Sequence, residues 1–261
     1  MPSDDAKVNR GLSVLMATIV VTVAACSGSN GDASIVATTD IAEPSAADPV
    51  EIEPEAMDAA EPETKKWMSV DADGCVCADG SPFEFWERPA DPTKVVLYFE
   101  GGGACFSAES CSFTDGTYVP SLNLGVSPGG RGGIFDQTNP ENPLADHSFV
   151  YVPYCSGDVF LGDNTQVYSD TLTVEHKGFP NATKGLDTVL ANYPDVEQLV
   201  VTGASAGSIP TPLFAGLAAD RLPGTKIITF GDSSAAYPDA GPINGLIGNL
   251  WGTTNNIPDW P

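Results

Sequence analysis

Apolar and polar residues alternate in blocks through the second half of the chain. Four short runs of β-branched and aromatic residues predict buried strands, at residues 94–99, 148–153, 197–202 and 226–230. Between them, apolar residues at helical spacing predict a helix over 181–193, and a second helix is predicted over 206–221. Alternating strands and helices are typical of a parallel sheet with helical crossovers, so the pattern favours the α/β class.

Residues 112–147 interrupt this alternation. They are rich in Gly, Asn and Pro and show no apolar period, which predicts a long loop region of the kind that builds a substrate pocket. The chain contains no internal repeat.

Charge narrows the range of partners. The 261 residues include 11 Lys and Arg against 35 Asp and Glu, a formal net charge of −24. Nucleic acids and anionic membrane surfaces both need clustered positive charge, so neither is expected as a partner. Hydrophobic residues make up 42% of the chain, enough for a packed core.

The N-terminus has the features of an export signal. Lys7 and Arg10 precede an apolar run at residues 12–25, which is too short for a membrane-spanning helix and fits a secretory signal. The run ends in the sequence VAAC, which resembles a bacterial lipobox with Cys26 as the lipidated residue. An ordinary signal peptide with a chance cysteine is the alternative. Because no Asp follows Cys26, we expect an outer-membrane anchor or release outside the cell.

Two further regions follow this predicted signal of residues 1–26. Residues 27–64 hold ten acidic residues, no Lys or Arg, and several prolines, which predicts an extended, disordered linker. Residues 65–261 are the predicted folded domain, and their 23 acidic and 9 basic residues give a net charge of −14.

Export permits disulfides. Five cysteines follow Cys26, at positions 75, 77, 105, 111 and 155. Five is an odd number, so one thiol has no partner within the domain. No histidine stands at ligand spacing from any pair, so structural disulfides are favoured over zinc.

The strongest chemical signal is the sequence GASAG at residues 203–207. It is a G-x-S-x-G motif between a predicted strand and a predicted helix, the context of a nucleophile elbow. Small residues at ±2 allow the strand and helix to approach, and the turn holds Ser205 above the carboxyl edge of the sheet. The N–H of Ala206 would then face an oxyanion. The alternative is a glycine-rich turn whose serine has no catalytic role. Upstream, Gly101, Gly102 and Gly103 follow another predicted strand, where they could supply further oxyanion donors.

Five segments together resemble the pectin acetylesterase family, which includes the Notum-type carboxylesterases. They are CADGS at 77–81, LYFEGGGACF at 97–106, YCSGD at 154–158, GASAG at 203–207 and GDSSAAYPD at 231–239. The resemblance implies an α/β-hydrolase-like fold and esterase chemistry without a metal or cofactor. It implies Ser205 as the nucleophile, with oxyanion N–H groups from Gly102, Gly103 and Ala206.

The resemblance also implies disulfides between Cys77 and Cys155 and between Cys105 and Cys111, which leaves Cys75 over. The chain departs from the family pattern at Ala104, where a large residue such as Trp is usual, and the smaller side chain would widen the acyl pocket. It departs again after the elbow, where Pro210 and Pro212 should tighten or kink the first helical turns.

A serine esterase also needs a base and an acid, in the chain order Ser, acid, His in this fold. Both histidines, His147 and His176, precede Ser205. In the family the acid and histidine come long after the elbow, so we expect the sequence to be a C-terminally truncated fragment. Either histidine could act as a substitute base, but a loop or surface role is favoured. The resemblance implies that Asp158 is a pocket-shaping or buried, hydrogen-bonded acid rather than a catalyst, and that Asp232 is a pocket residue. Asp232 is also an alternative triad acid.

The sequence therefore predicts an exported serine esterase that hydrolyses O-acyl esters, with acetyl on a polysaccharide as one candidate. The acidic domain would repel polygalacturonate, so a neutral acetylated glycan or a small ester fits better. The rival hypothesis is a non-catalytic surface binding protein on a hydrolase fold. The sequence leaves the oligomeric state open.

Overall fold

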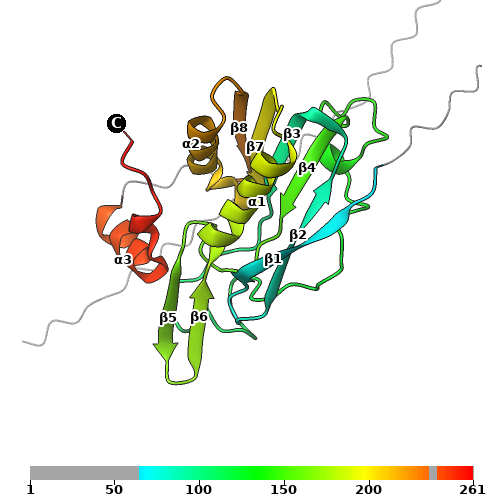
Figure 1. Ribbon diagram of the computed structural model, residues 1–261. Helices are drawn as coiled ribbons and strands as arrows, with labels where there is room; N and C mark the ends of the chain where they lie inside the picture. Colours follow the sequence, from blue (N-terminus) through cyan, green and yellow to red (C-terminus); the bar gives the residue numbers. More distant parts are fainter. Residues whose placement is uncertain (1–64, 235–239, 261) are drawn as a thin grey trace, which may run out of the picture. The chain divides into compact units, whose positions relative to one another are not determined.

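A six-stranded mixed sheet forms the centre of the protein in a computed structural model that describes residues 65–234 and 240–260 (Figure 1). Its strand order is β1-β2-β4-β3-β7-β8. The strands are β1 (Met68–Val76), β2 (Pro82–Arg88), β3 (Asp91–Phe99), β4 (His147–Val152), β7 (Gln198–Ala204) and β8 (Lys226–Asp232). β4, β3, β7 and β8 run parallel, whereas β1 and β2 are antiparallel additions at one edge.

The four predicted strands are all present, each within a few residues of its expected bounds. They belong to the parallel part of the sheet, where β3, β4 and β7 are buried on both faces, as continuous apolar runs require. β1, β2 and the two-stranded hairpin β5 (Asn164–Ser169) and β6 (Leu172–His176) were not predicted.

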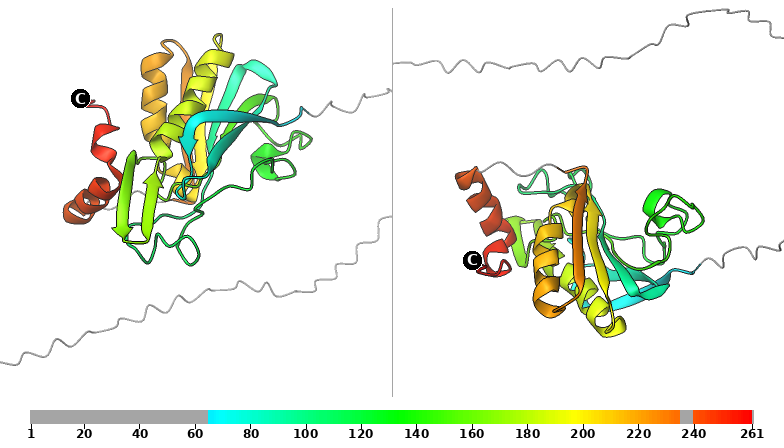
Figure 2. Two further views of the ribbon diagram at one scale, coloured as in Figure 1. Left: turned by 60° about the horizontal axis from the view of Figure 1, so that its bottom comes forward. Right: turned by 90° about the horizontal axis from the view of Figure 1, so that it is seen from above.

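Helices cover one face of the sheet. α1 (Gly178–Asn192) and α2 (Thr211–Arg221) lie there side by side (Figure 2), and Leu186, Val189 and Phe214 are fully buried on that face. On the other face, Phe135 and Leu144 of the long irregular segment pack against the sheet. A short 3-10 helix, η1 (Gly133–Phe135), is the one helical turn of that segment.

The helix predicted over 206–221 is divided in two. A 3-10 helix, η2 (Ser205–Ser208), follows β7 directly, and α2 begins only at Thr211. Pro210 is the N-cap of α2, and Pro212 occupies its first turn, where a missing N–H costs no hydrogen bond. The two prolines therefore set the start of α2 and interrupt the longer helix.

A third helix, α3 (Gly241–Trp251), packs beside the β5–β6 hairpin and leads into the 3-10 helix η3 (Thr253–Asn255) (Figure 1). Its Trp251 is buried, whereas Ile243 and Leu246 are exposed. Within the described ranges, no helix is long and apolar enough to span a bilayer.

Two disulfides link cysteines of the described residues, with the pairings that the family resemblance implies. Cys77 is bonded to Cys155, and Cys105 to Cys111. Cys75 is half-buried and forms no disulfide with the described residues, and burial raises the pKa of its thiol. The predicted signal, the lipobox cysteine Cys26 and the acidic linker all lie outside the described residues.

Candidate active site

The strand register brings the two glycine motifs to the carboxyl edge of the sheet, where the parallel strands end. β3 and β7 are parallel neighbours, and Phe99 pairs with Gly203 at their carboxyl ends. The chain leaves both strands at the same level, so residues 101–103 and Ser205 emerge side by side. A Cβ added to Gly101 would lie 3.0 Å from the Cβ of Ser205, which shows how closely the first glycine packs against the serine.

Ser205 occupies a sharp turn between β7 and η2. Its φ of 51° lies in the left-handed region, which a serine rarely adopts. A Cβ on Gly203 would meet the carbonyl oxygen of Gly207 at 2.2 Å, and a Cβ on Gly207 would meet that of Phe99 at 2.1 Å. Only glycine fits either position, and the side chain of Ser205 is left exposed at the edge.

The glycine loop is paired with Tyr118 and Val119. Gly103 and Tyr118 form an isolated antiparallel bridge, and the carbonyl of Gly102 accepts from the N–H of Val119 at 3.1 Å. Gly103 has a φ of 83°, and a Cβ there would meet the carbonyl oxygen of Thr117 at 2.0 Å. The third candidate donor, Ala206, is buried in the first turn of η2.

Two hollows open along this edge. One, of about 220 Å³, is lined by Gly101, Trp86 and Tyr151 among others. The second, of about 470 Å³, is lined by Ala204, Asp232 and neighbouring residues. Gly101 and Ala204, which line the first and the second hollow respectively, are both close to Ser205.

The first hollow is bordered by an ion pair that the sequence does not predict. Nη2 of Arg131 lies 2.6 Å from Oε1 of Glu100, the residue just before the three glycines. Arg131 also stacks over Tyr151, with its guanidinium carbon 5.3 Å from the ring centre. The pair joins the long irregular segment to the end of β3. Because its members are 31 positions apart in the chain, local spacing carries no signal for it.

Asp232 reaches the expected edge. It is the last residue of β8 and pairs in register with Ala204, next to Ser205. Its carboxylate accepts a hydrogen bond of 3.0 Å from the hydroxyl of Ser233. Asp232 is exposed and lines the second hollow, which fits a pocket residue.

Asp158 is fully buried. One carboxylate oxygen accepts from the Ser156 hydroxyl at 2.6 Å and from the N–H of Phe160 at 3.1 Å, and the other accepts from the N–H of Gly178 at 2.8 Å. Burial raises the pKa of Asp158, against the opposing effect of His176 and these hydrogen bonds. Since Gly178 is the first residue of α1, the carboxylate fixes the start of that helix.

Neither histidine faces Ser205. His147 is the first residue of β4 and pairs with Asp91, the first residue of β3. At about 3.3 Å of rise per residue, the length of β3 puts it roughly 25 Å from the edge that carries Ser205. The side chain is 4% exposed, and it contacts Asp146 at 2.8 Å and Gln198 at 3.1 Å. The prediction of a loop or surface residue is wrong for His147.

His176 is fully buried, so that prediction is wrong for it too. Its Nδ1 lies 2.9 Å from the carbonyl oxygen of Ser156, and its Nε2 lies 2.9 Å from the hydroxyl of Tyr168. A carbonyl accepts, so Nδ1 carries the proton and Nε2 accepts from the tyrosine. Both ring nitrogens are occupied, which leaves none for Ser205.

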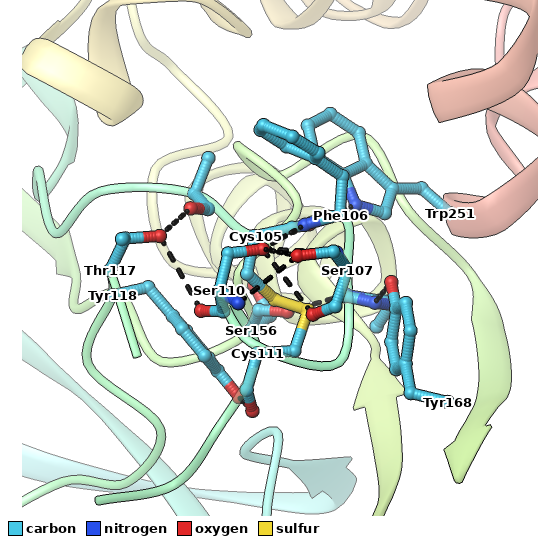
Figure 3. The surroundings of a disulfide bond; sticks show 12 residues. Cys105, Phe106, Ser107, Ser110, Cys111, Thr117, Tyr118, Ser156, Tyr168 and Trp251 are labelled. Atoms are coloured by element: carbon cyan, nitrogen blue, oxygen red, sulfur yellow. Dashed lines mark hydrogen bonds between the residues drawn. A yellow bond between two sulfur atoms is a disulfide. The ribbon is translucent and has the colours of Figure 1, made fainter. Parts of the chain in front are cut away.

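The same histidine adjoins the Cys105–Cys111 disulfide. Figure 3 shows this disulfide with Tyr168 and Trp251 in its surroundings. A ring nitrogen of His176 and the two sulfur atoms lie within 4.8 Å of one another, the spacing of a metal site. However, the sulfur atoms are bonded to each other, and a metal needs free thiolates. Trp251 of α3 is joined to this cluster, because its indole N–H donates to the carbonyl of Cys105 at 2.8 Å.

We expect His176 to make stability depend on pH. Burial lowers the pKa of His176, and the Asp158 carboxylate opposes this only in part. The unfolded chain therefore binds a proton below about pH 6.5 that the folded chain does not bind, so His176 removes stability as the pH falls from 7.5 to 5.5. Urea unfolding at pH 7.5 and pH 5.5 should show a smaller loss of unfolding free energy for His176→Gln than for the wild type. Equal losses would contradict this role of His176.

The fold and the turn at Ser205 together identify the structural class of the protein. A mostly parallel sheet, crossover helices and a left-handed serine directly after a central strand are the features of an α/β-hydrolase fold. Residues 59–244 match the model of the pectinacetylesterase family, and the chain belongs to that family.

Curated relatives agree with this assignment at modest identity. The chain is 28% identical to a palmitoleoyl-protein carboxylesterase NOTUM of Schmidtea mediterranea, over 51% of this chain and 26% of that protein. It is 27% identical to the carboxylesterase notum1' of Xenopus laevis, over 60% and 34%. It is 26% identical to pectin acetylesterase 4 of Arabidopsis thaliana, over 58% and 38%. The matched segment thus spans between a quarter and two fifths of each of these relatives.

Proposed function

We propose that this chain carries the nucleophile and the oxyanion hole of a serine esterase that hydrolyses O-acyl esters, with acetyl as the favoured acyl group. The observation that carries the proposal is the conformation of Ser205, an exposed serine at positive φ against the glycine loop. Family membership supports it, since the names of the relatives describe carboxylesterases and pectin acetylesterases.

In the proposed reaction, Oγ of Ser205 attacks the acyl carbon and the carbonyl oxygen becomes an oxyanion. The N–H groups of Gly102, Gly103 and Ala206 stabilise that charge, and collapse of the intermediate releases the alcohol and leaves an acyl-serine. Water then hydrolyses the acyl-serine. Both steps need a base, and because both histidines of the sequence are engaged elsewhere, neither of them is proposed as that base.

The acidic surface restricts the substrate. The net charge of the chain is −24, so a neutral acetylated glycan or a small neutral ester meets less repulsion than a polyanion. The two disulfides fit an exported protein. We also propose that Cys26 is the lipidated residue, and retention of Cys26→Ser in the membrane fraction would refute this anchor.

The test is release of p-nitrophenolate from p-nitrophenyl acetate by the full chain, with imidazole added as an external base. The expected result is a rate above that of imidazole alone. A rate equal to the imidazole blank would favour the rival hypothesis, a non-catalytic binding protein, which the engagement of both histidines also suggests.

A further inference from the structure

Glu100 is held by three contacts at the point where β3 ends and the glycine loop, residues 101–103, begins. Its backbone N–H donates to the carbonyl of Val152 at 3.0 Å. Its Oε1 atom lies 2.6 Å from Nη2 of Arg131, and its Oε2 atom accepts from the N–H of Tyr154 at 3.4 Å. Glu100 therefore joins the end of β3 to the chain at the end of β4 and to the long irregular segment.

Arg131 is fixed through its side chain rather than through its backbone. It stands between Gly130 and Gly132, and a Cβ added to either glycine would meet nothing within 4 Å, so the backbone here is not packed. The guanidinium, by contrast, has two supports. It stacks over the ring of Tyr151, a buried residue of β4, and it pairs with Glu100. The guanidinium is therefore tied to the rigid part of the sheet.

The glycine loop couples the position of Glu100 to that of Ser205. Gly101 follows Glu100 directly, and a Cβ on Gly101 would lie 2.6 Å from the carbonyl oxygen of Ala204 and 3.0 Å from the Cβ of Ser205. At such close packing, a shift of Glu100 also shifts the loop relative to the serine. A misplacement of about 1 Å in a reacting site can cost roughly 100-fold in rate, so small shifts matter here.

We propose that Arg131 is a positioning residue: by holding Glu100, it keeps the N–H groups of the glycine loop aimed at the carbonyl oxygen of a bound ester. This inference rests on the proposed esterase function, which assigns the oxyanion hole to that loop. Arg131 acts through Glu100 and not on the substrate, because the carboxylate at 2.6 Å already balances the charge of the guanidinium.

Direct contact of Arg131 with the substrate is the competing role, since Arg131 and Glu100 both line the first hollow. The two roles predict different results for Glu100→Gln. If Arg131 bound the substrate, removal of the Glu100 charge would free the guanidinium, and KM would fall. If Arg131 acts through Glu100, Glu100→Gln should lower kcat about as much as Arg131→Gln does.

The test is hydrolysis of p-nitrophenyl acetate by the full chain at a fixed imidazole concentration, with kcat and KM measured separately. Arg131→Gln should lower kcat about tenfold and leave KM within about twofold, because displaced donors weaken binding of the transition state more than binding of the ester. The double variant with Glu100→Gln should lose no more than either single variant. Arg131→Lys, which keeps the charge, should recover part of the loss.

Arg221→Gln is the matched control for Arg131→Gln. Arg221 forms an ion pair of 2.9 Å with Asp187, and its side chain is 38% exposed, against 48% for Arg131. This pair joins α2 to α1 and has no contact with the glycine loop. Arg221→Gln should therefore keep the wild-type kcat, which shows that loss of a half-exposed ion pair does not by itself impair the reaction.

A second measurement needs no activity, so it separates failure of this proposal from failure of the esterase proposal. In a Ser205→Ala background, backbone hydrogen exchange at residues 101–103 should be faster with Arg131→Gln than without it, whereas exchange within β3 should not change. If the wild type hydrolyses the ester no faster than the imidazole blank, the esterase proposal fails, and exchange alone decides whether Arg131 fixes the loop. Unchanged exchange at 101–103, a wild-type kcat in Arg131→Gln, or additive losses in the double variant overturns the proposal.

Discussion

Ser205→Ala should reduce the protein-dependent hydrolysis of p-nitrophenyl acetate to the rate of the imidazole blank. Without Oγ no acyl-serine can form, and the oxyanion donors then have no covalent intermediate to stabilise. The whole protein-dependent rate should therefore be lost, down to the rate of the blank. Unfolding should not contribute, because the Ser205 side chain is exposed.

Ser233→Ala is the matched control for this prediction. Ser233 is also exposed, follows the neighbouring strand β8, and has a positive φ of 59°. Its replacement should leave the rate near that of the wild type. If Ser205→Ala and Ser233→Ala retained equal activity, the assignment of Ser205 as the nucleophile would be wrong.

Gly207→Ala should destabilise the fold by about 3 kcal/mol, as overpacking against a rigid neighbour does. The added Cβ would lie 2.1 Å from the carbonyl oxygen of Phe99 and 2.6 Å from that of Glu100. Both atoms belong to backbone, so no side-chain rotation can relieve the contact. Either β3 or η2 must shift, and the shift would separate the glycine loop from Ser205.

Gly132→Ala is the control for Gly207→Ala. A Cβ at Gly132 would meet nothing within 4 Å, and its φ of −81° suits any residue. Urea unfolding should therefore separate the two variants, with Gly132→Ala close to the wild type. Equal unfolding free energies for both variants would contradict the close packing of the elbow on β3.

The parallel part of the fold could be predicted because its strands carry a strong local signal in the sequence. β3, β4 and β7 are buried on both faces, so their sequences are continuous apolar runs that stand out without any knowledge of neighbours. The turn at Ser205 was predictable for a similar reason, since the spacing of Gly203 and Gly207 is dictated by local sterics.

The edge elements were not predictable from local pattern. β1 carries the polar sequence MSVDADGCV and is a strand only through its pairing with β2. β5 alternates between half-buried and exposed positions, β6 has only five residues, and α3 contains three glycines and a proline. In each case tertiary contacts override weak local preference.

The environments of single polar residues could not be predicted from the sequence either. His176 is buried because Tyr168 and Ser156, eight and 20 positions away, satisfy its nitrogens. Arg88 meets Phe135 across 47 positions. No periodicity records such pairings, so sequence reasoning put both histidines at the surface and did not single out Arg88.

The most direct test of the central claim is to locate the acyl group. The full chain is incubated with p-nitrophenyl acetate and imidazole, digested, and its peptides are analysed by mass spectrometry. The account predicts one acetyl group on Ser205, and none at that site in Ser205→Ala. Acetylation spread over other residues, with Ser205 unmodified, would contradict the account.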